Sequence, residues 1–296
     1  MVEDPGEVRT AGGAVDEQSR QRPVALTVAG SDPSGGAGIQ ADLKTFTVHG
    51  VYGASVVTAL TAQNSVGVRG VHDVPSEFVS DQLAAVRDDL PVAAMKTGML
   101  ARAEVIEAVA DGLRGEAWIG GRPKLVVDPV MVATSGDVLL EADAVALLKA
   151  DLFPLADLVT PNLHEAAHLC GCAPATSLAE MVEQGQRLLA EGAAAVLIKG
   201  GHLQVGDGAA SSVDVLVEAD GSREFGSPRV VSRHTHGSGC TLSAAIAANL
   251  ACGHSLVDAI ARAKAFVTAA IQSAAAAPVG SGRAPLDHFA KSGGTH

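Results

Sequence analysis

Several kinds of residue and segment are scarce in this 296-residue chain. No apolar run reaches about 18 residues, which excludes a transmembrane helix. Asp and Glu outnumber Lys and Arg, the formal net charge is −12, and there is no basic block, so nucleic-acid binding is not expected. Four cysteines are too few for a disulfide scaffold in a chain of this length and predict reduced thiols in the cytoplasm. The absence of a GxxxxGK[ST] segment excludes a P-loop nucleotidase.

The first 22 residues differ in composition from the rest of the chain. They are rich in Gly, Glu, Asp, Arg and Gln and lack an apolar core, so we expect a flexible tail over 1–22 rather than a secretory signal. Residues 23–296 are predicted to form a single α/β domain, because such folds often reach this length as one unit. Abundant Ala, Val and Leu with only 3% aromatic residues are typical of a buried parallel sheet covered by helices.

Short apolar runs alternate with helical patterns along the chain. Strands are predicted at Val24–Ala29, Ser55–Ala59, Ala93–Thr97, Leu125–Asp128, Leu158–Thr160, Ala194–Ile198 and Val213–Glu218. Helices are predicted at Ile39–His49, Ser76–Asp89, Ala103–Leu113, Asp143–Lys149, His164–Leu169, Leu178–Glu191, Cys240–Ala251 and Leu256–Ala276. This alternation predicts βαβ units and a mostly parallel sheet with both faces covered. The segment Gly206–Ser232 is expected to form an antiparallel edge. Ligands of such sheets bind beyond the carboxyl ends of the strands.

One glycine-rich turn, from His234 to Thr241, runs directly into a predicted helix. The first N–H groups of a helix have no partner within the helix and favour anions, so Gly237, Ser238 and Gly239 are candidates for binding a phosphate. A thiol in the first turn would have a lowered pKa, which makes Cys240 a candidate base. The alternative is a tight turn with a small buried cysteine.

A second glycine-rich loop, Gly30–Gly38, follows the first predicted strand. Asp32 and Pro33 interrupt its resemblance to a dinucleotide-binding loop, and no acidic residue ends a strand about 20 residues later. Close approach of the loop to a small polar substrate is the favoured interpretation, and a purely structural loop is the alternative. Just past the second strand, the amides of Gln63 and Asn64 are able to bind a heteroaromatic edge or to form a turn.

Other polar residues follow the later strands. Asp128 and Glu165 are candidate Mg²⁺ ligands or, alternatively, a helix cap and a solvated charge. Lys199 is a candidate partner of phosphate or a simple edge lysine. The segment His164-Glu165-Ala166-Ala167-His168 matches the H-E-x-x-H zinc motif, with Glu183 or Glu191 as a conceivable third ligand. Because the motif starts just after a candidate N-cap, Asn162, a zinc hydrolase is the remote alternative. The pair Cys170 and Cys172 is interpreted as structural.

Several motifs together resemble one enzyme family. They are Ala29-Gly30-Ser31-Asp32-Pro33-Ser34-Gly35-Gly36-Ala37-Gly38-Ile39-Gln40-Ala41-Asp42-Leu43-Lys44-Thr45, Thr58-Ala59-Leu60-Thr61-Ala62-Gln63-Asn64, Lys96-Thr97-Gly98-Met99-Leu100, Val127-Asp128-Pro129-Val130-Met131, Ser135-Gly136-Asp137, Thr160-Pro161-Asn162-Leu163-His164-Glu165-Ala166, Lys199-Gly200-Gly201-His202 and Thr235-His236-Gly237-Ser238-Gly239-Cys240-Thr241. From about Val24 to Phe289 the chain resembles the hydroxymethylpyrimidine/phosphomethylpyrimidine kinases of thiamine biosynthesis, within the ribokinase-like superfamily. The resemblance implies a three-layer α/β/α sandwich.

The resemblance also implies an activity and a set of residue roles. The activity is transfer of the ATP γ-phosphoryl group to 4-amino-5-hydroxymethyl-2-methylpyrimidine, followed by a second transfer to the monophosphate. The implied substrate pocket consists of Ala37, Asp42, Thr61, Gln63 and Met99. Asn162, Lys199, Thr235 and Lys264 would face ATP, Asp128 and Glu165 would organise Mg²⁺, and Gly237, Ser238, Gly239 and Cys240 would form the anion hole and base.

The resemblance leaves some points open. Ser238 stands where the family often has Thr, and His164 stands where Pro is frequent, a difference that alone creates the H-E-x-x-H match. Pyridoxal or pyridoxamine kinase activity, in addition or instead, is the nearest alternative, because related enzymes share the scaffold and the cysteine. A homodimer is expected by analogy only.

Overall fold

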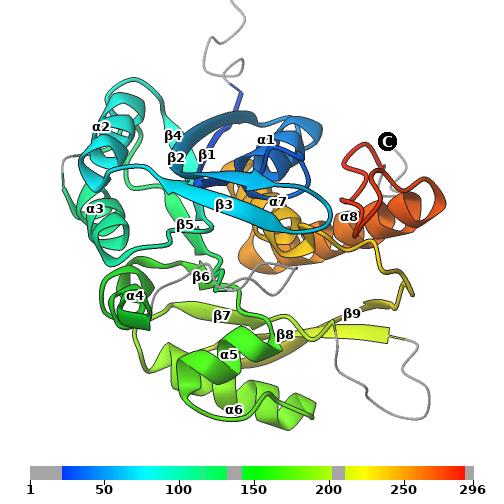
Figure 1. Ribbon diagram of the computed structural model, residues 1–296. Coiled ribbons are helices and arrows are strands. Elements are labelled where there is room, and N and C mark those ends of the chain that lie inside the picture. Colours follow the sequence, from blue (N-terminus) through cyan, green and yellow to red (C-terminus); the bar gives the residue numbers. More distant parts are fainter. Residues whose placement is uncertain (1–21, 116, 132–141, 202–210, 291–296) are drawn as a thin grey trace, which may run out of the picture.

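The computed structural model describes residues 22–115, 117–131, 142–201 and 211–290. In this part of the chain, nine strands form one sheet in the order β3-β2-β1-β4-β5-β6-β7-β8-β9 (Figure 1). The strands are β1 (Val24–Ser31), β2 (Tyr52–Gln63), β3 (Val68–Asp73), β4 (Val92–Thr97), β5 (Lys124–Val127), β6 (Leu158–Val159), β7 (Ala195–Ile198), β8 (Ser211–Glu218) and β9 (Gly221–Pro228). The six central strands β2, β1, β4, β5, β6 and β7 are parallel to one another. At the edges, β3 is antiparallel to β2, β8 to β7, and β9 to β8.

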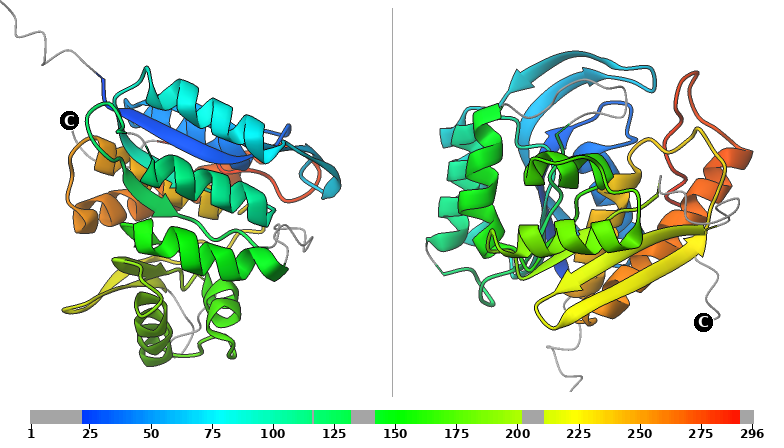
Figure 2. Two further views of the ribbon diagram at one scale, coloured as in Figure 1. Left: turned by 90° about the vertical axis from the view of Figure 1, so that its left-hand side faces the viewer. Right: turned by 90° about the horizontal axis from the view of Figure 1, so that it is seen from below.

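Helices cover both faces of the sheet. They are α1 (Gly38–Val48), α2 (Ser76–Arg87), α3 (Ala103–Arg114), α4 (Ala142–Leu147), α5 (Leu163–Cys170), α6 (Leu178–Leu189), α7 (Ser238–Ala251) and α8 (Leu256–Ala276). A π-helical turn, Leu148–Leu152, continues α4, and a 3₁₀ turn, Phe153–Leu155, follows it. In Figure 2 the orange α8 lies on the opposite side of the sheet from the green helices. None of the helices in the described ranges has the length and apolar character needed to cross a membrane.

Alternation along the central strands builds a separate core on each face. Val24, Leu26 and Val28 of β1 pack in a cluster with α2, α3, α5 and α6. Ala25 of the same strand belongs to a second cluster with α1, α7 and α8, and so does Ala94 of β4. Helix α7 is almost wholly buried between the sheet and its neighbours, which explains why its sequence is apolar on all sides. The predicted three-layer α/β/α architecture is therefore confirmed.

The structure departs from the predicted elements at the sheet edges. The strand β3 was not predicted, because Val68–Asp73 contains few apolar residues and is mostly exposed. It pairs with β2, which is much longer than the predicted Ser55–Ala59. The predicted antiparallel edge is confirmed as β8 and β9. The predicted tail, 1–22, lies outside the described residues except for Arg22, and the division into one tail and one domain stays a prediction.

Candidate active site

A cavity of about 1120 Å³ lies at the carboxyl ends of the parallel strands and is the meeting point of the predicted site residues. Its lining contains every residue of the implied substrate, ATP, metal and anion sites except Asp42, but not the candidate amide of Asn64. These residues are Ala37, Thr61, Gln63, Met99, Asp128, Asn162, Glu165, Lys199, Thr235, Gly237, Ser238, Gly239, Cys240 and Lys264. The cavity therefore lies where the ligands of parallel sheets are expected to bind.

The loop between β1 and α1 is organised by the buried side chain of Asp32. One carboxylate oxygen of Asp32 accepts hydrogen bonds from the backbone and the hydroxyl of Ser34, at 2.9 and 2.7 Å. The other accepts from the backbone N–H groups of Gly36 and Ala37, at 3.2 and 2.9 Å. Burial opposes the charge, but these bonds and His236 lower the pKa of Asp32 to about 2. Asp32 thus holds the loop in shape, and both backbone polar groups of Ala37 are engaged, its N–H by Asp32 and its carbonyl by the Ala41 N–H at 3.2 Å.

His236 joins this loop to the glycine-rich turn before α7. Its Nε2 lies 2.9 Å from the Asp32 carboxylate, and both side chains are buried. A Cβ on Gly36 would lie 2.6 Å from the His236 ring, so the two loops pack in direct contact. Sequence reasoning missed this pair, because the two residues are 204 positions apart and no local pattern connects them. His236 also lines the cavity.

Gln63 and Met99 lie at the end of the cavity nearest β2. The Thr61 hydroxyl donates to the carbonyl of Ser31 at 2.8 Å, which ties β2 to the end of β1. The same hydroxyl lies 3.4 Å from Oε1 of Gln63. The Met99 carbonyl accepts from the Thr58 hydroxyl at 2.6 Å, which holds this residue beside Gly30. The Gln63 amide is thereby positioned at the cavity wall as a donor and acceptor.

Asp128 and Lys199 form an ion pair at the centre of the strand ends. Nζ of Lys199 lies 2.9 Å from Oδ1 of Asp128, and Ser243 of α7 donates to Oδ2 at 3.1 Å. Burial works against the Asp128 charge, but Lys199 and Lys96 hold the pKa of Asp128 below its ordinary value. Burial likewise opposes the Lys199 charge, while Asp128 and Glu165 raise the pKa of Lys199. The pair therefore stays charged.

Glu165 is part of the N-terminal cap of α5. Oδ1 of Asn162 accepts from the backbone N–H groups of His164 and Glu165, both at 2.9 Å. In return Oε2 of Glu165 accepts from the Asn162 N–H at 2.7 Å, which completes a capping box. The predicted N-cap, Asn162, and the predicted metal ligand, Glu165, thus belong to the same capping box. Oε2 of Glu165 also lies 3.7 Å from Nζ of Lys199.

The electrostatics at Glu165 fit a divalent cation. Burial raises the pKa of Glu165 to about 7, Lys199 opposes this rise and Asp128 adds to it. Two carboxylates that share one lysine and disfavour each other's charge are the kind of oxygen donors that Mg²⁺ takes, together with substrate phosphates. The donor set of Asp128 and Glu165 therefore fits the predicted metal.

The zinc alternative gains no support. His164 and His168 line the cavity, but Glu165 between them is already engaged by the α5 cap and lies beside Lys199. Across the described ranges, no group of three or more His, Cys, Asp or Glu residues is arranged to hold a metal ion. A zinc site of the H-E-x-x-H type needs a third protein ligand.

Helix α7 begins at Ser238, after Gly237 in the left-handed conformation with φ +79°. A Cβ on Gly237 would overlap the carbonyl oxygen of Gly36, so only glycine allows the turn to approach the β1–α1 loop. No side chain caps the α7 N-terminus in the described part of the chain. Gly237, Ser238 and Gly239 line the cavity, with the Ser238 N–H engaged by the Thr235 carbonyl, and their role as an anion hole stays a prediction.

The prediction of a lowered thiol pKa is wrong for the unliganded protein. Burial raises the pKa of Cys240 to about 11. Lys96 and the Gly38 backbone act in the lowering direction, and Asp42 and Asp128 in the raising direction. Desolvation thus outweighs the helix terminus. Cys240 keeps its predicted position at the first turn of α7, but it is a neutral thiol near neutral pH.

Lys264 is placed at the cavity by an ion pair that was not predicted. Its Nζ lies 2.6 Å from Oδ2 of Asp214 on β8, and both side chains are buried. Oδ1 of Asp214 accepts from the Gly200 N–H at 3.0 Å. Asp214 therefore orients Lys264 and neutralises part of its charge. Thr235 lies on the same rim, and its carbonyl accepts from the Ser238 N–H at 3.1 Å.

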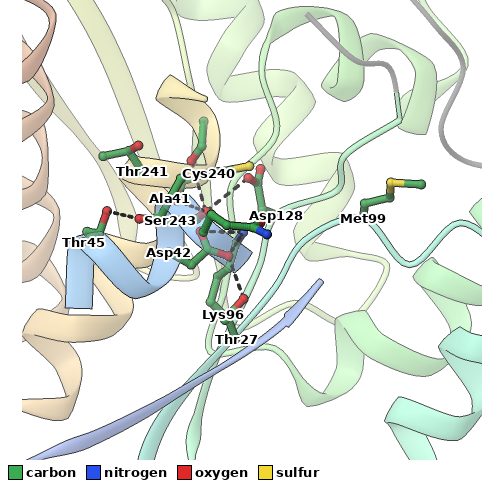
Figure 3. Close-up of polar contacts among 12 residues, drawn as sticks. Thr27, Ala41, Asp42, Thr45, Lys96, Met99, Asp128, Cys240, Thr241 and Ser243 are labelled. Carbon is green, nitrogen blue, oxygen red and sulfur yellow. Dashed lines mark hydrogen bonds and ion pairs between the residues drawn. The ribbon is translucent and has the colours of Figure 1, made fainter. Parts of the chain in front are cut away.

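Asp42 does not line the cavity, which corrects its predicted place in the substrate pocket. The side chain is fully buried in α1 and contacts Lys96 at 2.9 Å and Thr27 at 2.6 Å (Figure 3). The sequence reasoning placed Asp42 near the loop that contacts substrate. The helix, however, turns this carboxylate inward, toward the sheet, and away from the cavity.

The fold and the site define a small-molecule kinase of the ribokinase-like class. Residues 32–287 match the family model described as phosphomethylpyrimidine kinase, and the chain belongs to this family. It is 53% identical over 266 residues to the hydroxymethylpyrimidine/phosphomethylpyrimidine kinase of Rhizobium meliloti, covering 90% of this chain and 97% of that relative. The chain is an enzyme, a kinase, as the sequence predicted.

Two solved structures show the same fold. One is an ADP complex of Bacillus subtilis pyridoxal kinase, with a TM-score of 0.79 and 36% identity, covering 91% of this chain and 98% of that chain. The other is phosphomethylpyrimidine kinase from Clostridium difficile, with a TM-score of 0.71 and 40% identity, covering 83% and 98%. The predicted family and fold class are confirmed.

Proposed function

We propose that this kinase phosphorylates the hydroxymethyl group of 4-amino-5-hydroxymethyl-2-methylpyrimidine, and then the monophosphate, in thiamine biosynthesis. One observation carries the proposal: a single cavity joins the Gln63 amide to Lys199, Asp128 and the N-terminus of α7. Gln63 suits a ring with adjacent donor and acceptor groups. The opposite end of the cavity holds the positive groups that phosphoryl transfer requires. The Rhizobium meliloti relative has this activity in its name.

The residues at the Gln63 end bind and orient the substrate. The amide offers a donor and an acceptor to the edge of an aminopyrimidine. The Thr61 hydroxyl beside Oε1 restricts how the amide rotates. Gly30 allows Met99 to pack close, since a Cβ there would lie 3.2 Å from the methionine sulfur. A flat ring held between Gln63 and Met99 would direct its hydroxymethyl group toward Cys240.

The residues at the other end align and stabilise the migrating phosphoryl group. ATP is the donor, and Mg²⁺ held by Asp128 and Glu165 would supply positive potential at its phosphates. Lys199 is fixed by those two carboxylates and adds a cation, while the N–H groups of Gly237 and Gly239 add backbone donors. Alignment and positive potential supply most of the catalysis in phosphoryl transfer. Cys240 takes the proton of the attacking hydroxyl in its thiolate form, after its own proton has left to solvent.

Pyridoxal is the second candidate substrate. The Bacillus subtilis pyridoxal kinase covers 91% of this chain at a TM-score of 0.79, so this scaffold accommodates a pyridine alcohol in that protein. The amide of Gln63 favours an aminopyrimidine over a pyridine, because the pyrimidine presents both a ring nitrogen and an amino group. We therefore propose pyridoxal as a weaker substrate of the same cavity.

A turnover comparison tests the proposal. Hydroxymethylpyrimidine, its monophosphate and pyridoxal are each supplied with Mg-ATP, and ADP and phosphorylated product are quantified. The expected order of kcat/KM places both pyrimidines above pyridoxal, and Gln63→Leu raises KM for the pyrimidines more than for pyridoxal. Turnover of pyridoxal alone would refute the proposed substrate, and failure of the monophosphate alone would remove the second step.

A further inference from the structure

Lys96 and Asp42 form an ion pair that the proposed chemistry leaves unused. Both side chains have no solvent exposure, and Nζ of Lys96 lies 2.9 and 3.1 Å from the two carboxylate oxygens of Asp42. The Thr27 hydroxyl donates to the same carboxylate at 2.6 Å. Figure 3 shows the three side chains together below Cys240 and Asp128. Burial raises the pKa of Asp42, but the bidentate contact and the Thr27 bond are the geometry of a charged pair.

The position of Lys96 on β4 directs its side chain toward the active site. In register, Lys96 of β4 pairs with Thr27 of β1, on the same face as the apolar Ala25 and Ala94. The alternation of side chains between the two faces of β4 predicts an apolar residue at position 96 as well. The side chain then runs along the strand, since a Cβ on Gly98 would lie 2.9 Å from Nζ. The ammonium therefore lies level with the carboxyl end of β4, directly under the cavity.

Stability of the core does not account for this pair. Replacing a buried ion pair with apolar residues of similar volume is often neutral or stabilising, because both charges lose their hydration. Neither Asp42 nor Lys96 lines the cavity, so neither contacts a ligand there. A charged pair in the middle of the sheet therefore calls for a second reason to be present, and the Lys96 charge acts on the Cys240 sulfur.

Charged groups and dipoles from several elements surround the Cys240 side chain. Lys96 from β4, Lys199 after β7 and the backbone N–H of Gly38 in α1 favour a negative sulfur. Asp42 from α1 and Asp128 after β5 oppose it. Of these cations, Lys199 is shared by two carboxylates in the cavity, whereas Lys96 has one carboxylate partner and no exposure.

We propose that Lys96 is a positioning residue of this kinase: its buried ammonium, fixed by Asp42 and Thr27, favours the thiolate form of Cys240, which then takes the proton of the substrate hydroxyl. Lys96 contacts neither substrate nor nucleotide and acts through Cys240. Asp42 has an indirect role, because it holds the ammonium in place and offsets part of the electrostatic effect of the ammonium on the sulfur. This inference rests on the proposed function for its catalytic meaning, but its electrostatic part is measurable without any substrate.

The experiment follows alkylation of Cys240 by iodoacetamide as a function of pH in the full chain. Peptide mass spectrometry separates Cys240 from the other three cysteines. We expect Lys96→Met to slow the alkylation of Cys240 by roughly tenfold or more, which corresponds to one pKa unit. Asp42→Asn is expected to speed it, because the carboxylate that opposes the thiolate is gone. Lys96→Arg keeps the charge and should stay near the unaltered protein.

Opposite signs separate this role from a purely structural one. Loosened packing would expose Cys240 in both variants and shift alkylation in one direction. A common direction, or no shift in either variant, overturns the proposal. Lys124→Met is the matched control, since it removes an exposed lysine whose Nζ pairs with Asp157 at 2.8 Å, and it should leave alkylation unchanged.

A milder variant keeps the proposal testable if Lys96→Met fails to fold. Thr27→Val is nearly isosteric and removes only the hydroxyl that donates a hydrogen bond to the Asp42 carboxylate. We expect it to slow the alkylation of Cys240, in the same direction as Lys96→Met and by a smaller factor. An alkylation profile equal to that of the unaltered protein would overturn the proposal.

Kinetics then test the catalytic meaning. Lys96→Met should lower kcat for hydroxymethylpyrimidine with little change in KM, because the residue contacts no ligand. A rise in KM alone would overturn the positioning role. If the unaltered protein turned over none of the three substrates, the proposed function would fail, and the alkylation result would still stand by itself.

Discussion

Replacing Gly237 with alanine is expected to disable the kinase while leaving it folded. The residue has φ +79° at the N-terminus of α7, and an added Cβ would overlap the carbonyl oxygen of Gly36. The β1–α1 loop cannot give way easily, because Asp32 and His236 hold it against the same turn. The N–H groups of the anion hole must therefore move relative to the substrate loop.

The structure provides a matched control for the backbone strain. Gly253 follows the other end of α7 with φ +83°, and a Cβ there would meet nothing within 4 Å. A left-handed alanine costs about 1–2 kcal/mol at either position. Each variant should therefore lower the melting temperature by a few degrees, at about 2–4 °C for each kcal/mol in a chain of this size class.

The two variants differ only in what the added methyl group meets. A misplacement of about 1 Å in a reacting geometry can cost about 10²-fold in rate, or about 2.7 kcal/mol of transition-state stabilisation. We expect Gly237→Ala to lower kcat by about that factor and Gly253→Ala to leave it unchanged. KM for the pyrimidine should change less than kcat, because Gln63 and Met99 lie at the other end of the cavity.

The assay combines steady-state kinetics with Mg-ATP and thermal unfolding of both variants. A folded Gly237→Ala protein with a kcat about 10²-fold below that of Gly253→Ala, and a loss of melting temperature at least as large, would support the steric interpretation. A Gly237→Ala enzyme as active as Gly253→Ala would refute it, because the turn would then tolerate the displacement that the overlap with Gly36 requires. Loss of activity in both would assign the effect to α7 as a whole.

Three further outcomes are expected. Cys240→Ala should lower the rate of phosphorylation by about 10²-fold or more, the usual scale for a lost general base, and near-normal turnover would remove this role. His236→Ala should lower kcat by freeing the substrate loop from the α7 turn, whereas Ser34→Ala, which removes one hydroxyl bond to Asp32, should preserve it. Burial lowers the pKa of His288 to about 4. His288→Gln should therefore remove a loss of up to about 3 kcal/mol in the free energy of unfolding at acid pH, measured by urea unfolding. An unchanged pH profile would contradict this.

The sign of the His288 effect follows from proton uptake. The side chain is buried and its Nε2 lies 3.1 Å from the Thr241 hydroxyl. The neutral ring is favoured in the folded protein, so the unfolded chain binds more protons between pH 6.5 and about 4. The free energy of unfolding should therefore fall as the pH falls through this window, and the variant without a titrating ring should show a flatter profile.

Much of the site was predictable because of one rule about parallel sheets. Asp128, Asn162 and Lys199 each follow a short apolar run, and parallel strands bring such positions to one edge. The structure joins them with Glu165 through a capping box and an ion pair. The helix signals were equally local, and the main departures are shifts of a residue or two at helix ends, where the boundary depends on cap geometry.

Contacts between distant segments were not predictable from one sequence. His236 and Asp32 meet only because two loops from opposite ends of the chain interlock at the cavity. The edge strand β3 depends on pairing with β2 rather than on its own composition. Asp42 shows the limit of motif reasoning, since a charged residue close to a binding loop in sequence turned inward to Lys96. A lysine inside the apolar run Val92–Thr97 was the available signal, and it went unused.

Cys240 shows how two local effects compete and which one is larger. A helix terminus is worth about 0.3–1 kcal/mol, and up to about 2 kcal/mol when partly buried, which is at most about 1.5 pKa units. Desolvation of a buried group can shift a pKa by about 3–5 units. The larger effect decides the outcome, and the pKa of Cys240 rises to about 11. The resting thiol is therefore neutral, and only the small fraction that has lost its proton to solvent can accept the proton of the substrate hydroxyl. Lys96 favours that thiolate form over the neutral thiol.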